Sequence, residues 1–229
     1  MATPYDIDHL AEVGSTQDAA SQRRAASGRP TLVVADRQTS GRGRSGRVWL
    51  EPDTAMYSSL ALARPWPDDR LTLLPLATAI AVRRALAALG GVTVDLKWPN
   101  DLLRSGRKVG GILVEASGDD VVIGCGVNLT WSRPPSFAIA VHDDDANAIG
   151  ARQLASGWVD ELLRVLDAGP DDWPRSEYVD ACTTLGSQVA WDGGTGLAST
   201  IDAVGGLVVE TSTGTETVIA GDVHLRADL

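Results

Sequence analysis

The sequence predicts an α+β protein, with a mixed β-sheet flanked by helices and a small C-terminal β unit. Over residues 1–184, short β-branched apolar runs alternate with longer stretches of helical spacing. From residue 185 the helical spacing stops, and Gly-rich turns separate five short β-like runs. A chain of 229 residues can form one sizeable domain and a small appendage. We therefore expect a main domain over 1–184 and a small C-terminal domain over 185–229.

The first elements lead toward a glycine-rich loop. Residues 5–13 have the pattern of a leading strand, and an Ala-rich helix should follow up to Gly28. Ser15 is the expected N-cap of that helix, with Asp18 completing a capping box. Residues 31–36, Thr-Leu-Val-Val-Ala-Asp, are typical of a buried strand. This strand should fix the base of the loop that comes next.

The later elements are predicted from the same two patterns, helical spacing of apolar residues and short β-branched apolar runs. Helices are expected over residues 71–89 and 151–167, with a short one near 173–178; the expected strands are 54–63, 92–98, 109–116, 121–129, 188–191, 197–204, 207–210, 216–220 and 223–225. Pro99-Asn100-Asp101 marks a turn. Glycines interrupt two of these strands, at Gly110-Gly111 and at Gly124 and Gly126, which indicates close approach of a ligand or another backbone.

Composition excludes several classes of protein. The formal net charge is -10, which disfavours general nucleic-acid binding. The N-terminus lacks the regions of a signal peptide, and no apolar run reaches the roughly 18 residues of a membrane span. Cys125 and Cys182 form no CxxC pair, so neither a disulfide framework nor a structural zinc is indicated. We expect a cytoplasmic protein.

Residues 39–49, Thr-Ser-Gly-Arg-Gly-Arg-Ser-Gly-Arg-Val-Trp, are hereafter called the arginine loop. They contain three glycines, three arginines and no acidic residue. Glycines allow a backbone to approach a ligand closely, and arginines offer planar donor forks to carboxylate and phosphate. The loop is therefore a candidate anion site. The alternative is a solvated turn whose arginines maintain solubility.

Other candidates also have ordinary interpretations. Ser15 and Thr16 suit helix capping, and Lys97 and Lys108 suit exposed strand ends. Trp49 and Trp98 are most often core residues, while Asn100, Asp101 and Asn128 suit turns. The run at 142–145, His-Asp-Asp-Asp, has metal-ligand residue types but is more often simply solvated.

Five segments, read together, resemble the motifs of one family, the biotin protein ligases. They are Ser15-Thr16, Gln38 to Trp49, Lys97-Trp98-Pro99-Asn100-Asp101, Gly106 to Glu115, and Gly124-Cys125-Gly126-Val127-Asn128-Leu129. Each motif alone is weak, but five in register are specific. The resemblance covers residues 14–129 and extends to the C-terminal segment that ends in residues 221–226, Gly-Asp-Val-His-Leu-Arg.

The resemblance implies a fold and a two-step reaction. The fold would be like class II aminoacyl-tRNA synthetases and biotinyl/lipoyl ligases, with a small SH3-like β-barrel at the C-terminus. Biotin and ATP would form biotinyl-5′-AMP, and a lysine of a biotin carboxyl-carrier protein domain would then take the biotin. The chain looks like a short form without the N-terminal DNA-binding domain, acting as a monomer or weak homodimer without DNA or membrane. Mg²⁺ is expected because pyrophosphate leaves.

The resemblance also implies roles for individual residues. Lys108 and Arg44 would be catalytic. Biotin would be bound by Ser15, Thr16, Gln38, Gly41, Arg42, Gly43, Arg44, Lys108 and Gly111. ATP or AMP would be bound by Arg47, Trp49, Lys97, Asn100 and Asn128, and no protein metal ligand is expected.

Two departures and two rivals accompany this hypothesis. Gln17 stands where the family usually has Asn, and Cys125 has no visible activating partner, so we interpret it as a small buried hydrophobe. The nearer rival is a lipoate or octanoate ligase or transferase, which typically lacks the arginine loop and the Lys97–Asp101 motif. The other is a non-catalytic biotin or nucleotide sensor; the full set of cations argues against it, because binding biotin alone would not need phosphate-facing charge.

Overall fold

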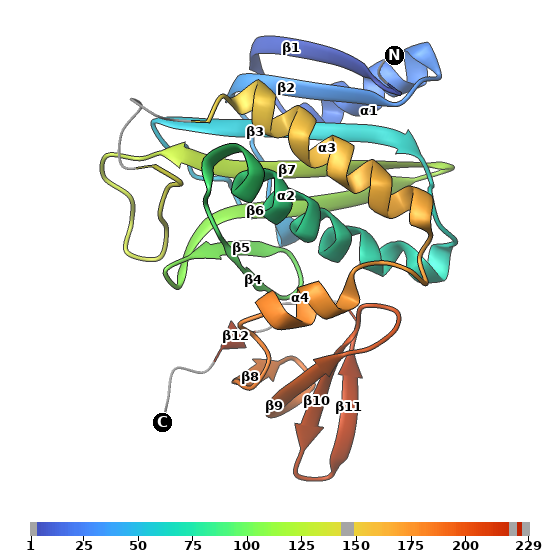
Figure 1. The fold of residues 1–229 in the computed structure, drawn as a ribbon, viewed down its shortest axis with the longest axis vertical. Helices are drawn as coiled ribbons and strands as arrows, with labels where there is room; N and C mark the ends of the chain where they lie inside the picture. The colour runs from blue at the N-terminus through green and yellow to red at the C-terminus, as the bar shows by residue number, and fades with distance from the viewer. Residues whose placement is uncertain (1–3, 143–148, 220–223, 226–229) are drawn as a thin grey trace.

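A seven-stranded mixed sheet forms the main body of the computed structural model, which describes residues 4–142, 149–219, 224 and 225 (Figure 1). Its strands lie in the order β1-β2-β3-β7-β6-β5-β4. They are β1 (Asp6–Val13), β2 (Thr31–Gln38), β3 (Thr54–Ala63), β4 (Asp95–Lys97), β5 (Asp101–Arg104), β6 (Arg107–Ser117) and β7 (Asp120–Thr130). Only β1 and β2 pair in parallel, because helix α1 (Thr16–Ser27) supplies the crossover that a parallel pair requires.

Helices cover both faces of this sheet. Helices α2 (Leu74–Gly90) and α3 (Ala151–Ala168) lie side by side across one face (Figure 1). Strand alternation places Leu32 and Val34 of β2 in the large core cluster with these two helices. Val33, between them, packs instead with Ala19 and Ala20 of α1. Helix α1 therefore covers the opposite face, and only part of it.

Helix α2 is apolar nearly all round. With the preceding 3-10 segment η2 (Asp68–Leu73) it is long and apolar enough to cross a membrane by length and composition. However, 61% of the most apolar window is buried inside the protein, where it packs against α3 and the sheet. We interpret it as a core helix.

The C-terminal region is a five-stranded antiparallel sheet joined to the main body by the short helix α4 (Arg175–Ala181). Its order is β11-β10-β9-β8-β12, and the strands are β8 (Gln188–Trp191), β9 (Gly194–Ile201), β10 (Leu207–Thr211), β11 (Gly214–Val218) and β12 (His224–Leu225). β11 and β12 end this order, so the described strands form an open sheet and not a closed barrel.

The C-terminal sheet packs directly on the main body. The Trp98 indole Nε1 donates to the Gly205 carbonyl at 2.9 Å, and the Thr72 hydroxyl donates to the Val204 carbonyl at 2.6 Å. Core residues of the two sheets belong to one continuous cluster. Since a piece of this size buries little core by itself, the main domain supports it, as the sequence predicts. The exact division at residues 184 and 185 stays a prediction.

The sequence predicts the α+β class and most element bounds correctly, but some details are wrong. Strand β4 is three residues long instead of the seven expected, and the expected turn at 99–101 runs directly into β5, which the sequence analysis misses. The capping box is also wrong, because Ser15 makes no side-chain cap hydrogen bond. The Gln38 carboxamide oxygen instead accepts from the Thr16 backbone N–H at 2.8 Å.

Candidate active site

A cavity of about 510 Å³ opens on the face of the main sheet that α1 only partly covers. Its size is that of a typical small-molecule site. Every predicted site residue except Gly41 lines it, from α1, the arginine loop, β6, β7 and the β4–β5 turn; these are Ser15, Thr16, Gln38, Arg42, Gly43, Arg44, Arg47, Trp49, Lys97, Asn100, Lys108, Gly111 and Asn128. Segments far apart in sequence thus converge on one pocket.

The arginine loop forms one wall of this cavity. The Thr39 and Ser40 N–H groups donate to the carbonyls of Val13 and Gly14, at 3.0 and 2.8 Å, and so fix the base of the loop. Gly43 and Arg47 close its tip with a 2.7 Å backbone hydrogen bond around the short 3-10 turn η1 (Arg44–Gly46). Gly41, outside the cavity wall, accepts from the Trp49 N–H at 3.1 Å. The loop is therefore a compact hairpin rather than a loosely solvated turn.

Glycines in β6 and β7 make room for the side chains that cross the sheet. A Cβ at Gly126 would lie 2.9 Å from the Trp49 ring, and a Cβ at Gly111 would lie 3.3 Å from both Trp49 and the Lys108 amine. A Cβ at Gly124 would lie 2.8 Å from the Gln17 carboxamide oxygen. These glycines are closely approached, but by side chains of this chain rather than by the ligand or backbone that the sequence predicts.

Strand register divides the cavity floor into two ends. Ser59, Gly124 and Leu113 share one row across β3, β7 and β6, and Tyr57, Gly126 and Gly111 share another. Thr16, Gln38 and Ser59 form the polar end. Arg44, Asn100, Asp101 and Lys108 form the charged end. Trp49 lies over the row of Gly126 and Gly111, between the two.

The polar end is tightly hydrogen-bonded. The Gln38 carboxamide oxygen accepts from both the backbone N–H and the hydroxyl of Thr16, at 2.8 and 3.0 Å. The Ser59 hydroxyl donates to the Thr16 hydroxyl oxygen at 2.8 Å. Ser15, Thr16 and Ser59 are all buried. This end presents a rigid set of uncharged polar groups, which suits an uncharged polar ligand group.

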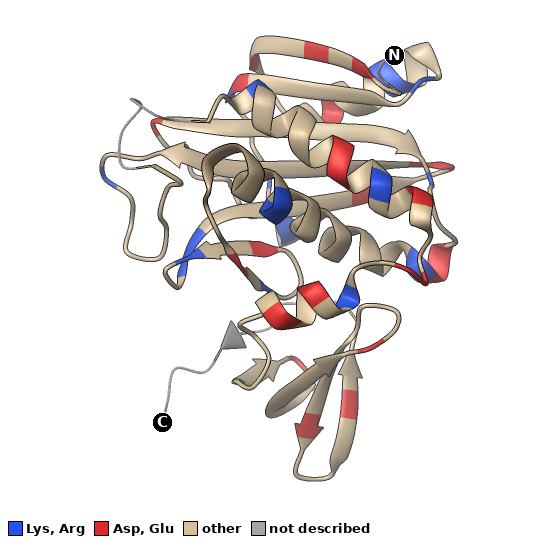
Figure 2. Ribbon diagram, in the orientation of Figure 1, with Lys and Arg blue, Asp and Glu red and all other residues tan. Residues whose placement is uncertain are grey.

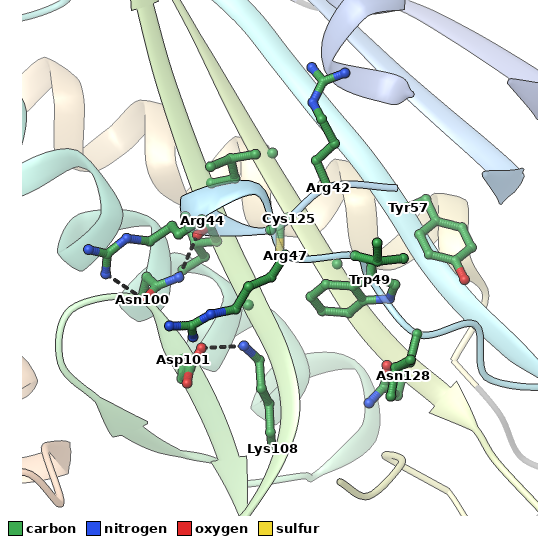
Figure 3. A pocket seen from close by; sticks show the side chains of 18 of the residues that line it. Arg42, Arg44, Arg47, Trp49, Tyr57, Asn100, Asp101, Lys108, Cys125 and Asn128 are labelled. Carbon is green, nitrogen blue, oxygen red and sulfur yellow. Dashed lines mark hydrogen bonds and ion pairs between the residues drawn. The ribbon is translucent and has the colours of Figure 1, made fainter. Parts of the chain in front are cut away.

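Lys108 organises the charged end. Its amine lies 2.5 Å from an Asp101 carboxylate oxygen and 5.8 Å from the centroid of the Trp49 ring (Figure 3). Nearby, the Arg44 guanidinium donates to the Asn100 side-chain oxygen at 3.1 Å, and the Asn100 amide donates to the Ile112 carbonyl at 2.9 Å. Lys108 and Arg44 are therefore both held against oxygen atoms of neighbouring residues.

Arg42 and Arg47 lie differently from Arg44. Figure 3 shows the Arg42 side chain directed away from Lys108 and Asn100. It makes a bidentate ion pair with Asp18, with N–O distances of 2.9 and 2.8 Å. Hydrogen bonds from Arg42 lower the pKa of the Asp18 carboxyl, and in return they raise the pKa of Arg42. Arg47 is exposed at the mouth of the cavity.

Three buried polar atoms of residues that line the cavity have no hydrogen-bond partner. They are the side-chain oxygens of Asn128 and Gln17 and the indole N–H of Trp49. The Asn128 amide donates to the Ile139 carbonyl at 3.0 Å, which leaves its oxygen as an acceptor. An unmade buried hydrogen bond costs about 1–3 kcal/mol. A ligand that supplies both a donor and an acceptor would recover that cost.

Cys125 is not a nucleophile in this site. It lines the cavity floor, but burial raises the pKa of its thiol far above the ordinary value. A protonated, buried thiol is a poor nucleophile. The interpretation of Cys125 as a small buried hydrophobe is confirmed.

Charge is unevenly distributed in the molecule. Residues 176–225 contain no Lys or Arg, and Asp and Glu positions occur along α4 and the C-terminal sheet (Figure 2). Five cations line the cavity, namely Arg42, Arg44, Arg47, Lys97 and Lys108. The site is thus a cationic pocket within an acidic protein, as expected for anionic ligands.

Several lining residues were missed by the sequence analysis: Tyr57, Ser59, Leu113, Trp131 and Phe137. Strand period alone could have placed Tyr57 and Ser59 on one face, but it does not say which face carries the site. Phe137 is 61% exposed at the cavity mouth and has no sequence signal. Among the described residues, no group of three or more His, Cys, Asp or Glu could hold a metal. Residues 143–145 of the acidic run lie outside the described residues.

Two family models account for this fold and site. Residues 12–128 match the biotin/lipoate A/B protein ligase family, and residues 184–226 match the biotin protein ligase C-terminal domain. The chain belongs to the biotin/lipoate A/B protein ligase family. Within it, the relatives that the chain resembles over most of its length are biotin ligases.

The biotin–acetyl-CoA-carboxylase ligase of Mycobacterium tuberculosis is 35% identical over 242 residues, covering 96% of this chain and 89% of that protein. The bifunctional ligase/repressor BirA of Bacillus subtilis is 31% identical over 215 residues; the match covers 85% of this chain but 66% of that protein. Among solved structures, the biotin protein ligase from Aquifex aeolicus in complex with biotin and ATP has a TM-score of 0.81 at 28% identity. That match covers 97% of this chain and 99% of the other.

Proposed function

We infer that this chain is an ATP-dependent biotin protein ligase, which activates biotin as biotinyl-5′-AMP and transfers it to a lysine of a biotin carboxyl-carrier protein. The observation that carries this inference is one cavity that joins an uncharged polar end to a cationic end. A ligand made of an uncharged polar ring and an acidic tail that is joined to a nucleotide needs an uncharged polar end followed by a cationic end. Relatives and structural neighbours named as biotin ligases support the same reaction.

The first half-reaction brings two anions together. A carboxylate oxygen of biotin attacks the α-phosphorus of ATP, an O–P bond forms, and pyrophosphate leaves. Fixed cations must offset the repulsion between carboxylate and phosphate and stabilise the charge that develops. We assign this task to Lys108 and Arg44. Both are already positioned by oxygen partners, so little reorganisation is needed when those partners are exchanged for the substrate.

Other roles follow from the same geometry. Thr16, Ser15 and Gln38 bind the biotin ring system, and Gly111 lets its tail pass close to β6. Arg47 and Lys97 contact phosphates. Trp49, Asn100 and Asn128 bind the nucleotide; the two unpartnered atoms of Trp49 and Asn128 support this assignment, because adenosine offers both donors and acceptors.

In the second half-reaction the carrier lysine, as the free amine, attacks the acyl carbon of the adenylate. A C–N bond forms, the C–O bond to the phosphate breaks, AMP leaves and the ammonium proton is lost to solvent. The lysine must reach the cavity through its mouth, where Arg47 and Phe137 are exposed. That the acceptor lysine belongs to a biotin carboxyl-carrier protein is part of the proposal.

Magnesium enters with the nucleotide. Mg²⁺ prefers oxygen ligands and usually binds phosphates with few protein contacts. Asp101, Asn100 and Asn128 offer side-chain oxygen atoms on the cavity wall, so these residues fit a phosphate-bound ion. Its contribution would be charge neutralisation on the leaving pyrophosphate.

The polar end also separates this function from its nearer rival. Lipoate and octanoate have apolar head groups without N–H donors, and burying the Thr16 and Gln38 polar groups against them would cost free energy. The cationic end separates it from a sensor, because biotin alone carries no phosphate.

Mass spectrometry tests the proposal directly. Purified protein incubated with biotin and Mg-ATP should retain biotinyl-adenylate, while lipoate and octanoate should give none. Finding no biotinyl adduct, with lipoyl or octanoyl adenylate in its place, would overturn the assignment.

Three further properties stay predictions: location in the cytoplasm, a monomer or weak homodimer, and absence of DNA binding. Sedimentation of the protein with and without biotin and ATP checks the oligomeric state. A filter-binding assay with duplex DNA checks the predicted absence of DNA binding.

A further inference from the structure

The arginine loop is fastened to two opposite walls of the cavity. Arg44 bonds to Asn100 at the charged end, at 3.1 Å. Arg42 forms its bidentate pair with Asp18, in the first turn of α1, at 2.9 and 2.8 Å. Both arginines lie within four residues of the loop tip, so each bond holds the part of the loop that covers the cavity.

Further contacts connect Arg42 to the cavity wall. A second carboxylate, Glu115, lies 3.7 Å from the Arg42 guanidinium. The same carboxylate accepts a 2.9 Å hydrogen bond from the Gln17 amide. Gln17 is 95% buried, since its exposed fraction is 5%, and its side chain packs over Gly124 on the cavity floor.

The orientation of the Gln17 amide is fixed by its surroundings. Its nitrogen lies within 3.5 Å of three acceptors: Glu115, the Leu113 carbonyl and the Val122 carbonyl. The NH₂ group, with two donor hydrogens, can face these acceptor oxygens, whereas the carboxamide oxygen cannot donate to them. Glu115 therefore links a buried residue of the polar end to an arginine of the loop.

The ion pair between Arg42 and Asp18 differs from another surface ion pair of α1, the one between Arg23 and Asp8. Arg23 contacts Asp8 through a single N–O distance of 2.8 Å on the exposed side of the helix, away from the cavity. Arg42 instead makes two parallel bonds, the stronger and more directional arrangement for Arg and carboxylate. It also spans two separate segments that border the same cavity.

We propose that Asp18, supported by Glu115, is a positioning residue that anchors Arg42 and thereby holds the arginine loop closed over the polar end of the cavity. This inference rests on the proposed function. Its consequence is retention of the acyl-adenylate between the two half-reactions. Neither carboxylate contacts the reacting atoms, so the rate of adenylate formation on the enzyme stays the same when the anchor is lost.

The test compares Asp18→Asn with Asp8→Asn. Each variant removes one carboxylate charge from an arginine pair near α1, but only the first pair reaches the loop. Protein loaded with labelled biotinyl-adenylate is chased with unlabelled biotin and ATP, and label release is followed. Asp18→Asn should release adenylate about 5-fold faster and raise the KM for biotin in proportion, as expected for an exposed pair worth up to about 1 kcal/mol. Asp8→Asn should match the wild type.

The effect of ionic strength on the rate of adenylate release is a second, independent test. Raising ionic strength screens exposed ion pairs. Release from the wild type should therefore accelerate toward the Asp18→Asn rate, while release from Asp18→Asn should change little. This reading on wild-type protein decides the matter if Asp18→Asn loses its cooperative thermal transition.

A charge reversal completes the design. Asp18→Arg combined with Arg42→Asp restores an ion pair of opposite polarity and should recover slow release, whereas either single change should not. Release at the wild-type rate from Asp18→Asn, with no salt dependence in the wild type, would overturn the anchor. Absence of biotinyl-adenylate from the wild type would instead overturn the proposed function, so the two failures are distinguishable.

Discussion

The two ends of the cavity are prepared for ligands in different ways. At the polar end, Thr16, Gln38 and Ser59 satisfy one another through hydrogen bonds of 2.8 to 3.0 Å, although the buried side-chain oxygen of the neighbouring Gln17 has no partner. At the charged end, Lys108 and Arg44 are held by Asp101 and Asn100, and nearby buried atoms of Asn128 and Trp49 have no partner. From this difference we infer that the polar end is largely fixed before binding, and we predict that the charged end exchanges its internal partners for the substrate.

The largest effect is expected where the charged end must supply fixed charge. Lys108→Ala should slow biotinyl-adenylate formation by about 10³-fold, the loss typical of one electrostatic stabiliser. Single-turnover quench kinetics measures it. Arg107→Ala is the matched control, because Arg107 is an exposed cation beside Lys108 but does not line the cavity. Near-normal turnover by Lys108→Ala would remove Lys108 from its assigned role.

A change at the polar end should act on binding rather than on chemistry. Thr16→Val removes the hydroxyl that links Gln38 to Ser59 but keeps the backbone bond to Gln38. The KM for biotin should rise about 30-fold, within the cost of leaving buried polar groups unpaired. The KM for ATP should stay unchanged in steady-state assays. Equal increases in both constants would show that the two ends are not separable.

The middle of the cavity depends on the space above Gly126. Gly126→Ala would place a Cβ 2.9 Å from the Trp49 ring and push that ring toward the nucleotide side. Overpacking of this kind costs about 1–3 kcal/mol, so the KM for ATP should rise roughly tenfold. Gly150→Ala is the control, since its Cβ meets only an ordinary 3.9 Å contact. Unaltered ATP binding in Gly126→Ala would show that Trp49 does not border the nucleotide.

The smallest effect concerns Cys125 on the floor between the two ends. Burial raises the pKa of its thiol, so the thiol stays protonated at pH 8 and should resist iodoacetamide in the native protein. Intact mass after alkylation checks this, with unfolded protein as the positive control. Rapid native labelling at Cys125 would show that the floor opens and that the polar end is less rigid than its hydrogen bonds indicate.

The sequence predicts the class of fold and the position of the arginine loop, because periodicity and glycine placement are local signals. The convergence of the motifs on one site is what the family resemblance implies. Glycines at 111, 124 and 126 indicated close approach, which side chains of this chain make. The partners of individual side chains are long-range facts and could not be predicted. The capping box at Ser15 and Asp18 failed for this reason, since Gln38 comes from β2 and Arg42 from the loop.

Tertiary context also explains the other differences. β5 was missed because residues 101–104 follow a turn signal and reach only four residues. Phe137 and Trp131 enter the cavity wall from a loop whose sequence has no period. Arg42, grouped with ligand contacts by the resemblance, is bound to Asp18 in the structure, and its role as a biotin contact stays a prediction.

The division of the cavity into two ends is tested most directly by a crystal structure with biotinyl-5′-AMP bound. We predict the bicyclic ring of biotin beside Thr16 and Gln38, the mixed anhydride beside Lys108 with its bond to Asp101 exchanged, and adenosine within hydrogen-bond distance of the Asn128 oxygen or the Trp49 N–H. An adenylate bound in the reverse direction, or with Lys108 still on Asp101 and away from the anhydride, would contradict it.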